Sequence, residues 1–122
     1  MVEMLDIGIN NAVAYRVEGK VTEDEMKSIL SIFKEKIQAG AKLSVYQEIV
    51  SVGGAEFDAI IEKLKFFHEF GLSNFVKIAV VTHKEWMHKI IDLEGKLFKK
   101  FDMKGFSIDD KDKALEFLKN SE

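Results

Sequence analysis

The segment Phe75–Val81, with the sequence FVKIAVV, decides the class of fold that this chain adopts. Apart from Lys77, it is a nearly continuous run of apolar and largely β-branched residues. A strand that is buried on both faces has this composition, whereas a strand with one solvent face alternates apolar and polar side chains. Such strands belong to sheets whose two faces are covered by helices. We therefore predict that Phe75–Val81 is the central strand of a mostly parallel sheet in an α/β domain.

Upstream of this strand, a helix is predicted between Thr22 and Gly40. Thr22 stands three residues before Glu25, which is the spacing of a capping box, and Gly40 is a typical helix stop. The apolar residues between them recur on one helix face: Met26, Ile29, Leu30, Phe33 and Ile37. Lys42–Val50, which follows, alternates with the two-residue period of a strand.

The first twenty residues predict a β-hairpin. Ala12–Gly19 has the two-residue period of a strand, and the shorter segment Leu5–Ile9 precedes it. Asn10 and Asn11 join the two segments, and asparagine tolerates the positive φ angles that tight hairpin turns require. We expect the two segments to pair as antiparallel strands.

Downstream elements repeat the alternation of helix and strand. An apolar stripe after the Ser51–Gly54 loop predicts a second helix that ends at Gly71, and a third helix begins near Thr82 or Lys84. A short strand around Phe106 precedes a last helix, which holds Ala114, Leu115 and Leu118 and which Asp109 and Asp110 are expected to cap. The predicted order is ββαβαβαβα, with helices packed on the sheet, in one domain that spans residues 1–122.

Composition excludes several classes of function. The 122 residues are 47% hydrophobic and 32% charged, which suits a single globular domain. There is no cysteine, so disulfides and cysteine-ligated metal sites are excluded. A net charge of −3 argues against a nucleic-acid partner. No stretch has the length and apolar composition of a signal peptide or a membrane span, so we expect a cytoplasmic protein.

No catalytic or metal-binding motif is present. His83 and His88 are five residues apart, which would place them on different faces of a helix, and neither has a third ligand at a diagnostic spacing. No Gly-x-Ser-x-Gly sequence occurs, and the acidic pairs fall at predicted helix starts. We expect no catalytic residue, no metal and no cofactor, and hence a protein that is not an enzyme.

Three segments, Glu62–Phe66, Ile78–Val81 and Lys84–Met87, resemble the SpoIIAA-like family. The resemblance extends over almost the whole chain, from Ala14–Gly19 to Ala114–Leu118. It implies the STAS fold of anti-sigma-factor antagonists. It also implies a non-catalytic regulatory or binding module that docks partner proteins.

The resemblance also implies where a partner docks. In phosphorylated STAS antagonists the acceptor serine follows an aspartate at the start of the second helix, where this chain has Ser51-Val52-Gly53-Gly54. No aspartate–serine pair is present, and Ser51 is the only hydroxyl nearby, so we expect no phosphorylation switch. The expected partner-binding residues are Ser51, Gly53, Gly54 and Phe57.

An alternative function is to carry or sense a small nonpolar ligand, because related families of this shape bind nonpolar molecules. The chain has ten phenylalanines, which is many for a tight core of this size. In this alternative the third helix, Lys84–Phe101, hinges away from the sheet. The expected ligand-binding residues are Phe66, Phe67, Trp86, Ile90 and Phe98.

Peripheral membrane contact belongs to the same alternative. The run Lys96–Phe106 interleaves lysines with large apolar residues, a pattern typical of segments that lie on an anionic membrane or enter a partner groove. The expected membrane-facing residues are Lys96, Lys99, Lys100, Phe101 and Lys104, with Phe98 and Phe106 as further apolar contacts. A surface helix whose lysines reach into solvent explains the same pattern. Homodimerisation through an exposed apolar helix face is a further expectation.

Overall fold

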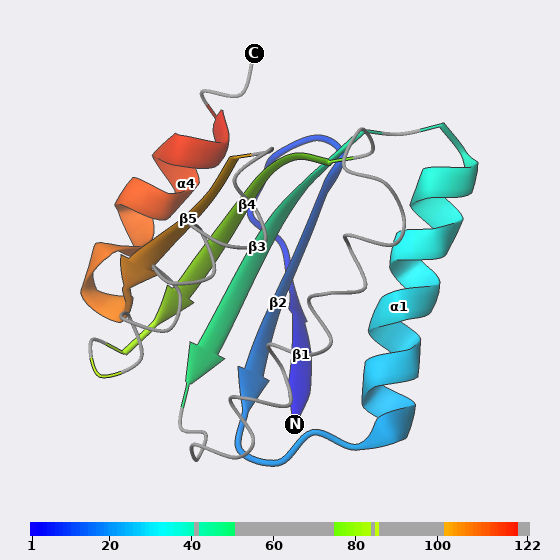
Figure 1. Cartoon of the computed structure of the whole chain (residues 1–122), viewed down its shortest axis with the longest axis horizontal. Helices are drawn as coiled ribbons and strands as arrows, with labels where there is room; N and C mark the ends of the chain where they lie inside the picture. The colour runs from blue at the N-terminus through cyan, green and yellow to red at the C-terminus, as the bar shows by residue number, and fades with distance from the viewer. Residues whose placement is uncertain (41, 51–74, 84, 86–101, 120–122) are drawn as a thin grey trace.

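One five-stranded sheet organises the chain (Figure 1). The computed structural model describes residues 1–40, 42–50, 75–83, 85 and 102–119. The described elements are β1 (Val2–Leu5), β2 (Ala12–Glu18), α1 (Glu23–Gln38), β3 (Leu43–Val50), β4 (Phe75–Thr82), β5 (Asp102–Ser107), the 3-10 turn η3 (Ile108–Asp110) and α4 (Lys111–Lys119). The strands lie in the order β1-β2-β3-β4-β5, with β1 antiparallel to β2 and all other neighbours parallel. The predicted α/β architecture is confirmed, while the predicted second and third helices fall outside the described residues.

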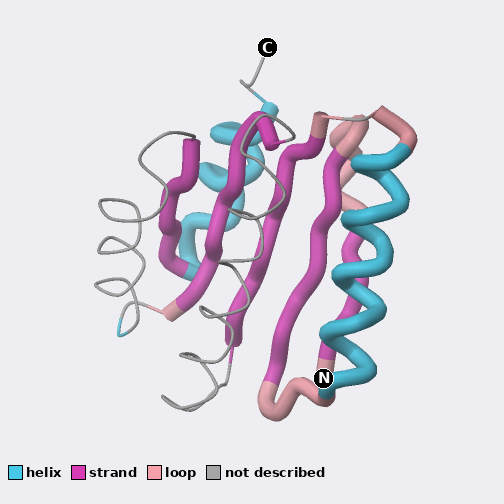
Figure 2. The backbone as a smooth tube through the Cα atoms, turned by 45° about the vertical axis from the view of Figure 1, so that its right-hand side comes forward, coloured by secondary structure: helices cyan, strands magenta, loops and turns pink. Residues whose placement is uncertain are grey.

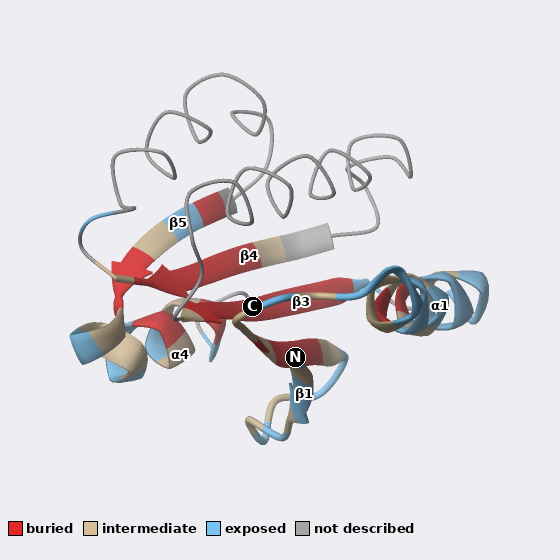
Figure 3. Cartoon of the chain, turned by 90° about the horizontal axis from the view of Figure 1, so that it is seen from below, coloured by how far each residue is buried: buried red, intermediate tan, exposed pale blue. Residues whose placement is uncertain are grey.

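The two described helices lie on opposite faces of the sheet (Figures 2 and 3). On one face Tyr15 of β2 meets Phe33 of α1 edge to face, with ring centroids 6.4 Å apart. On the other face α4 buries Ala114 and Leu118 in a cluster with side chains from four strands: Ala14, Tyr46, Ala79, Val81 and Phe106. Alternate residues of each strand therefore belong to two different layers of the core.

Strand β4 is buried on both faces, as its composition predicts, but its predicted central position is wrong, because β3 is the middle strand of the five and β4 lies between β3 and β5. Ile78, Ala79, Val80 and Val81 are each at most 1% exposed, and Thr82 is completely buried. The Thr82 hydroxyl donates a hydrogen bond to the carbonyl of Ile49 on β3 at 2.9 Å. This bond satisfies the buried hydroxyl at the end of the strand.

The first helix has the predicted caps. Thr22 Oγ1 accepts a hydrogen bond from the Glu25 backbone N–H at 3.1 Å, and the Glu25 carboxylate accepts one from the Thr22 N–H at 3.1 Å. The same carboxylate accepts a bond from the Val2 N–H at 2.7 Å, so the cap also fastens β1 to α1. Gly40 follows the helix with φ of 84°, a conformation that favours glycine.

The predicted first strand, Leu5–Ile9, is wrong in position. The strand is β1, Val2–Leu5, and residues 6–11 form the connection to β2. Gly8 has φ of 71°, and the Asp6 carboxylate accepts a hydrogen bond from the Gly8 N–H at 3.0 Å, so the chain turns where the prediction kept it extended. The antiparallel pairing itself is confirmed, and Asn11 has the expected positive φ, 55°.

The end of the chain corrects two further expectations. Phe106 lies in β5 and is 8% exposed, with its ring centroid 5.6 Å from that of Phe117, so it belongs to the core and not to a lipid-facing surface. Ser107, and neither Asp109 nor Asp110, caps the turn before α4, because its hydroxyl accepts a hydrogen bond from the Asp109 N–H at 3.4 Å. No helix in the described ranges is long and apolar enough to cross a membrane.

Candidate functional site

The structure describes one of the site residues expected from the sequence, Lys104. This residue is exposed on β5, with its ammonium 5.5 Å from the centre of the Phe106 ring. The other expected site residues lie outside the described ranges: Ser51, Gly53, Gly54, Phe57, Phe66, Phe67, Trp86, Ile90, Lys96, Phe98, Lys99, Lys100 and Phe101.

The start of the expected partner-binding segment is nevertheless fixed by the strand that leads into it. Val50, the last residue of β3, directly precedes Ser51 and pairs with Glu18 at the end of β2. On the other side, Thr82 of β4 pairs with Ser107 of β5. The four parallel strands therefore end together, and the segment begins at their shared carboxyl edge, where open α/β sheets commonly bind ligands.

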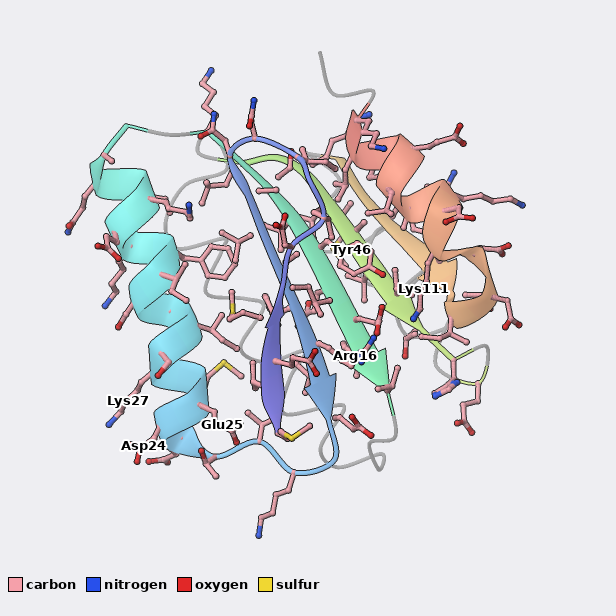
Figure 4. All side chains as sticks on the ribbon, turned by 180° about the vertical axis from the view of Figure 1, so that it is seen from behind. Arg16, Asp24, Glu25, Lys27, Tyr46 and Lys111 are labelled. Atoms are coloured by element: carbon pink, nitrogen blue, oxygen red, sulfur yellow. The ribbon has the colours of Figure 1, made fainter. Side chains whose placement is uncertain are left out.

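A buried charge on β3 is the main site feature that sequence reasoning did not anticipate. Glu48 is 2% exposed and lies beside Arg16 of β2 in the sheet register. Tyr46, two residues earlier on β3, faces the same side, and Lys111 reaches over from the start of α4 (Figure 4). We call Arg16, Tyr46, Glu48 and Lys111 the Glu48 cluster.

Both oxygens of the Glu48 carboxylate are occupied. Oε1 accepts a hydrogen bond from the Tyr46 hydroxyl at 2.8 Å and lies 3.3 Å from Lys111 Nζ. Oε2 accepts a hydrogen bond from Arg16 Nε. A guanidinium nitrogen of Arg16 also lies 3.9 Å from the Glu3 carboxylate, so the cluster extends to β1.

Electrostatics keep the cluster in one protonation state at neutral pH. Burial raises the pKa of Glu48, but the hydrogen bonds from Tyr46 and Arg16 and the charge of Lys111 outweigh it, and the net shift is downward. The pKa of Arg16 is raised by its hydrogen bond to Glu48 and by the negative charge of that residue. Burial and the same carboxylate raise the pKa of Tyr46. Glu48 is therefore ionised, Arg16 is charged, and Tyr46 keeps its proton.

This geometry suits a structural tie better than acid–base chemistry. A general base needs a free lone pair and a pKa near the working pH, whereas Glu48 accepts from three donors and its pKa is lowered. Within the described ranges no group of three His, Cys, Asp or Glu residues is placed to hold a metal ion. The cluster joins β2, β3 and α4 and reaches β1 through Glu3, and the positive charges of Arg16 and Lys111 compensate the buried Glu48 carboxylate.

A second buried polar group lies on the opposite face of β3. Gln47 is 2% exposed, and its Oε1 has no hydrogen-bond partner among the residues that the structure describes. Its neighbours in the register are Tyr15 of β2 and Val80 of β4. Tyr15 is itself buried, which raises the pKa of its hydroxyl. Gln47 Oε1 is thus a buried acceptor without a partner among the described residues, and an unmet hydrogen bond at a buried group is costly.

The sequence gives a weak indication of the Glu48 cluster and of the buried Gln47. Besides Ser44, the strand LSVYQEIV is interrupted by Gln47 and Glu48, large polar side chains at positions that burial makes unfavourable for them. Their partners could not be read from the sequence, because Arg16 is 32 residues away and depends on the β2–β3 register. Lys111 comes from an element still further along the chain.

Comparisons with known proteins agree on the fold. A model of the SpoIIAA-like family matches residues 12–119. The chain is also similar to a solved structure from Shewanella loihica PV-4, an uncharacterized protein of the DUF3478 family with a SpoIIAA-like fold. The two share 14% sequence identity, the similarity covers 97% of this chain and 92% of that chain, and the TM-score is 0.63. No curated protein matches the chain.

Proposed function

Because this chain belongs to the SpoIIAA-like family, we propose that it is a non-catalytic regulatory module that docks a protein partner. The observation that carries the proposal is the shared carboxyl edge of β2, β3, β4 and β5, from which β3 leads directly into the segment that begins at Ser51. The same segment is the docking site expected from the resemblance to STAS antagonists, which supports the proposal.

The state of the buried charges supports the non-catalytic part of the proposal. Glu48 is the one acidic side chain among the buried described residues, and its three donors hold it as a compensated carboxylate. Substituting Glu48 should first lower stability, because Arg16 and Lys111 would lose the carboxylate that both of them face and the buried Tyr46 hydroxyl would lose its acceptor.

Ser51 is the position that tests docking. Binding at the carboxyl edge should tolerate both Ser51→Ala and Ser51→Asp to the same degree, since the aspartate–serine pair of phosphorylated antagonists is missing. A bulky Ser51→Trp change should instead lower partner affinity by obstructing the surface. Ser31→Trp is the matched control, because Ser31 is exposed on α1.

The measurement is affinity capture on immobilised protein, followed by titration of the captured partner against each variant. Loss with Ser51→Trp and retention with Ser31→Trp supports docking at this edge. A partner that binds the alanine form and not the aspartate form would restore the phosphorylation switch. Equal binding by all four variants would move the docking surface elsewhere.

A second candidate function, carriage of a small nonpolar ligand, is favoured by Gln47. A ligand with an apolar body and one hydroxyl or amide donor would satisfy its buried Oε1. Native mass spectrometry of freshly purified protein tests this by looking for a co-purified molecule. The mass of such a molecule should disappear with Gln47→Leu and persist with Gln38→Leu, an exposed glutamine at the end of α1.

A further inference from the structure

The C-terminal helix α4 is tied to the sheet by a lysine contact at each end. At its first residue, Lys111 Nζ lies 3.3 Å from Glu48 Oε1. Near its last turn, Lys77 of β4 donates a hydrogen bond to the carbonyl of Phe117 at 3.0 Å. The same ammonium lies 4.4 Å from the centre of the Phe117 ring. Polar contacts therefore fasten both ends of the helix to the middle of the sheet.

The apolar contacts of α4 lie between these two ends. The helix has nine residues, of which Ala114 and Leu118 are buried, while Leu115 and Phe117 are partly covered. A helix of this length does not persist alone in water, since about 12–15 residues are marginal even for sequences with strong helix propensity. Its folding thus depends on contact with the sheet.

The charge of Lys111 affects the stability of α4 at its first residue. A lysine at the first position of a helix faces the positive end of the helix dipole, which disfavours it. Lys111 is compensated by Glu48, whose carboxylate is also faced by Arg16 from β2 and by the Tyr46 hydroxyl from β3. Glu3 of β1 reaches this group only through Arg16. The Lys111–Glu48 contact is therefore the place where a change in charge loosens the helix.

We propose that α4 is a releasable strap, latched to the sheet by Lys111–Glu48 and by Lys77–Phe117, which leaves the sheet while the five strands remain folded. Release uncovers the apolar strip beneath it: Ala14, Tyr46, Ala79, Val81 and Phe106. The strap is independent of docking at the carboxyl edge, because it concerns one face of the sheet and none of the expected partner-binding residues, Ser51, Gly53, Gly54 and Phe57.

Hydrogen exchange of the full chain, followed by mass spectrometry at neutral pH, tests the strap. In the wild type, the amides of residues 114–119 should exchange faster than those of β3, as expected for a unit that opens locally. Lys111→Met should accelerate exchange in α4 about five-fold and leave β3 unchanged, an effect in the range of a partly exposed ion pair. Lys111→Arg keeps the charge and should restore wild-type exchange.

Lys113→Met is the matched control, because Lys113 is in the same helix, its side chain is 71% exposed and its ion-pair partner is Asp110 in the preceding turn. The Lys113→Met variant should exchange at the wild-type rate.

Equal exchange rates in α4 and β3 of the wild type would overturn the proposal, as would an unchanged rate in Lys111→Met. If Lys111→Met fails to fold, hydrogen exchange of the wild type at increasing salt concentration tests the strap instead. Concentrated NaCl should accelerate exchange in α4 alone, and its failure to do so would also overturn the strap.

Discussion

Glu48 shows how a single buried residue makes stability depend on pH. Its pKa is lowered in the folded chain, so the folded state binds the proton more weakly than the unfolded state, in which the pKa is about 4.3. The resulting stabilisation is complete above that unfolded value and is lost as pH falls through the lowered folded value. Acid therefore acts on the fold through this carboxylate.

We expect the free energy of unfolding to fall more between pH 6 and pH 3 in the wild type than in Glu48→Gln. Urea denaturation across this range measures the difference. Glu116→Gln removes one carboxylate from the exposed face of α4 and should keep the wild-type slope. Parallel curves for the wild type and Glu48→Gln would show that the Glu48 cluster does not supply the pH dependence.

Ile78 tests the core at the same scale. It is 1% exposed on β4, between Val45 of β3 and Met103 of β5 in the register. Ile78→Ala should destabilise the fold by about 2–5 kcal/mol, because the substitution leaves a cavity that the sheet cannot close. Chemical denaturation is the measurement, and a midpoint equal to that of the wild type would contradict the assigned packing.

At the scale of elements, the sequence predicted boundaries well where local residues set them, and β2, β3 and β4 begin and end within one residue of their predicted bounds. The cap of α1 was readable because Thr22 and Glu25 lie within one turn and bond to each other. The end of β1 was not readable, because the turn at Gly8 that follows the strand depends on the Asp6 side chain and on a backbone conformation. The capping role of Ser107 was also missed. It depends on β5 ending at that residue, which could not be read from the sequence.

The capping box gives the prediction at this scale. Thr22→Ala should lower the free energy of unfolding by about 0.5–2 kcal/mol, since an N–H in the first turn of α1 loses its acceptor. Ser31→Ala, at an exposed position inside the same helix, should change it by less than about 0.5 kcal/mol. Urea denaturation compares the two variants. Equal losses would show that the cap contributes no more than an ordinary surface residue.

For the whole molecule, the sequence predicted the sheet because a buried parallel strand such as β4 has a distinctive composition. It did not predict the order of the strands or the Glu48 cluster, since both depend on which segments become neighbours after folding. Arg16 and Lys111 look like ordinary surface residues in the sequence, and only the β2–β3 register and the position of α4 bring them to one carboxylate.

The run Lys96–Phe106 illustrates the same limit and leads to a prediction for the whole molecule. Its alternation of lysines and apolar residues suggested a membrane surface, but Phe106 is in the core and Lys104 lies on a strand of the sheet. The chain also carries a net charge of −3, which opposes attraction to an anionic bilayer. We therefore expect the wild type to remain in solution with neutral and with anionic vesicles at low salt.

Vesicle co-sedimentation measures this, with a variant in which Lys96, Lys99, Lys100 and Lys104 are all changed to glutamine as the matched comparison. Each lysine near an anionic surface contributes on the order of 1 kcal/mol to binding, and this contribution falls as salt rises. Retention of the wild type on anionic vesicles, lost both in the quadruple variant and at high salt, would contradict the expectation and favour the membrane alternative. If the wild type and the quadruple variant both bind anionic vesicles, a different surface makes the contact. Removing four positive charges must weaken binding if the run Lys96–Phe106 itself contacts the membrane.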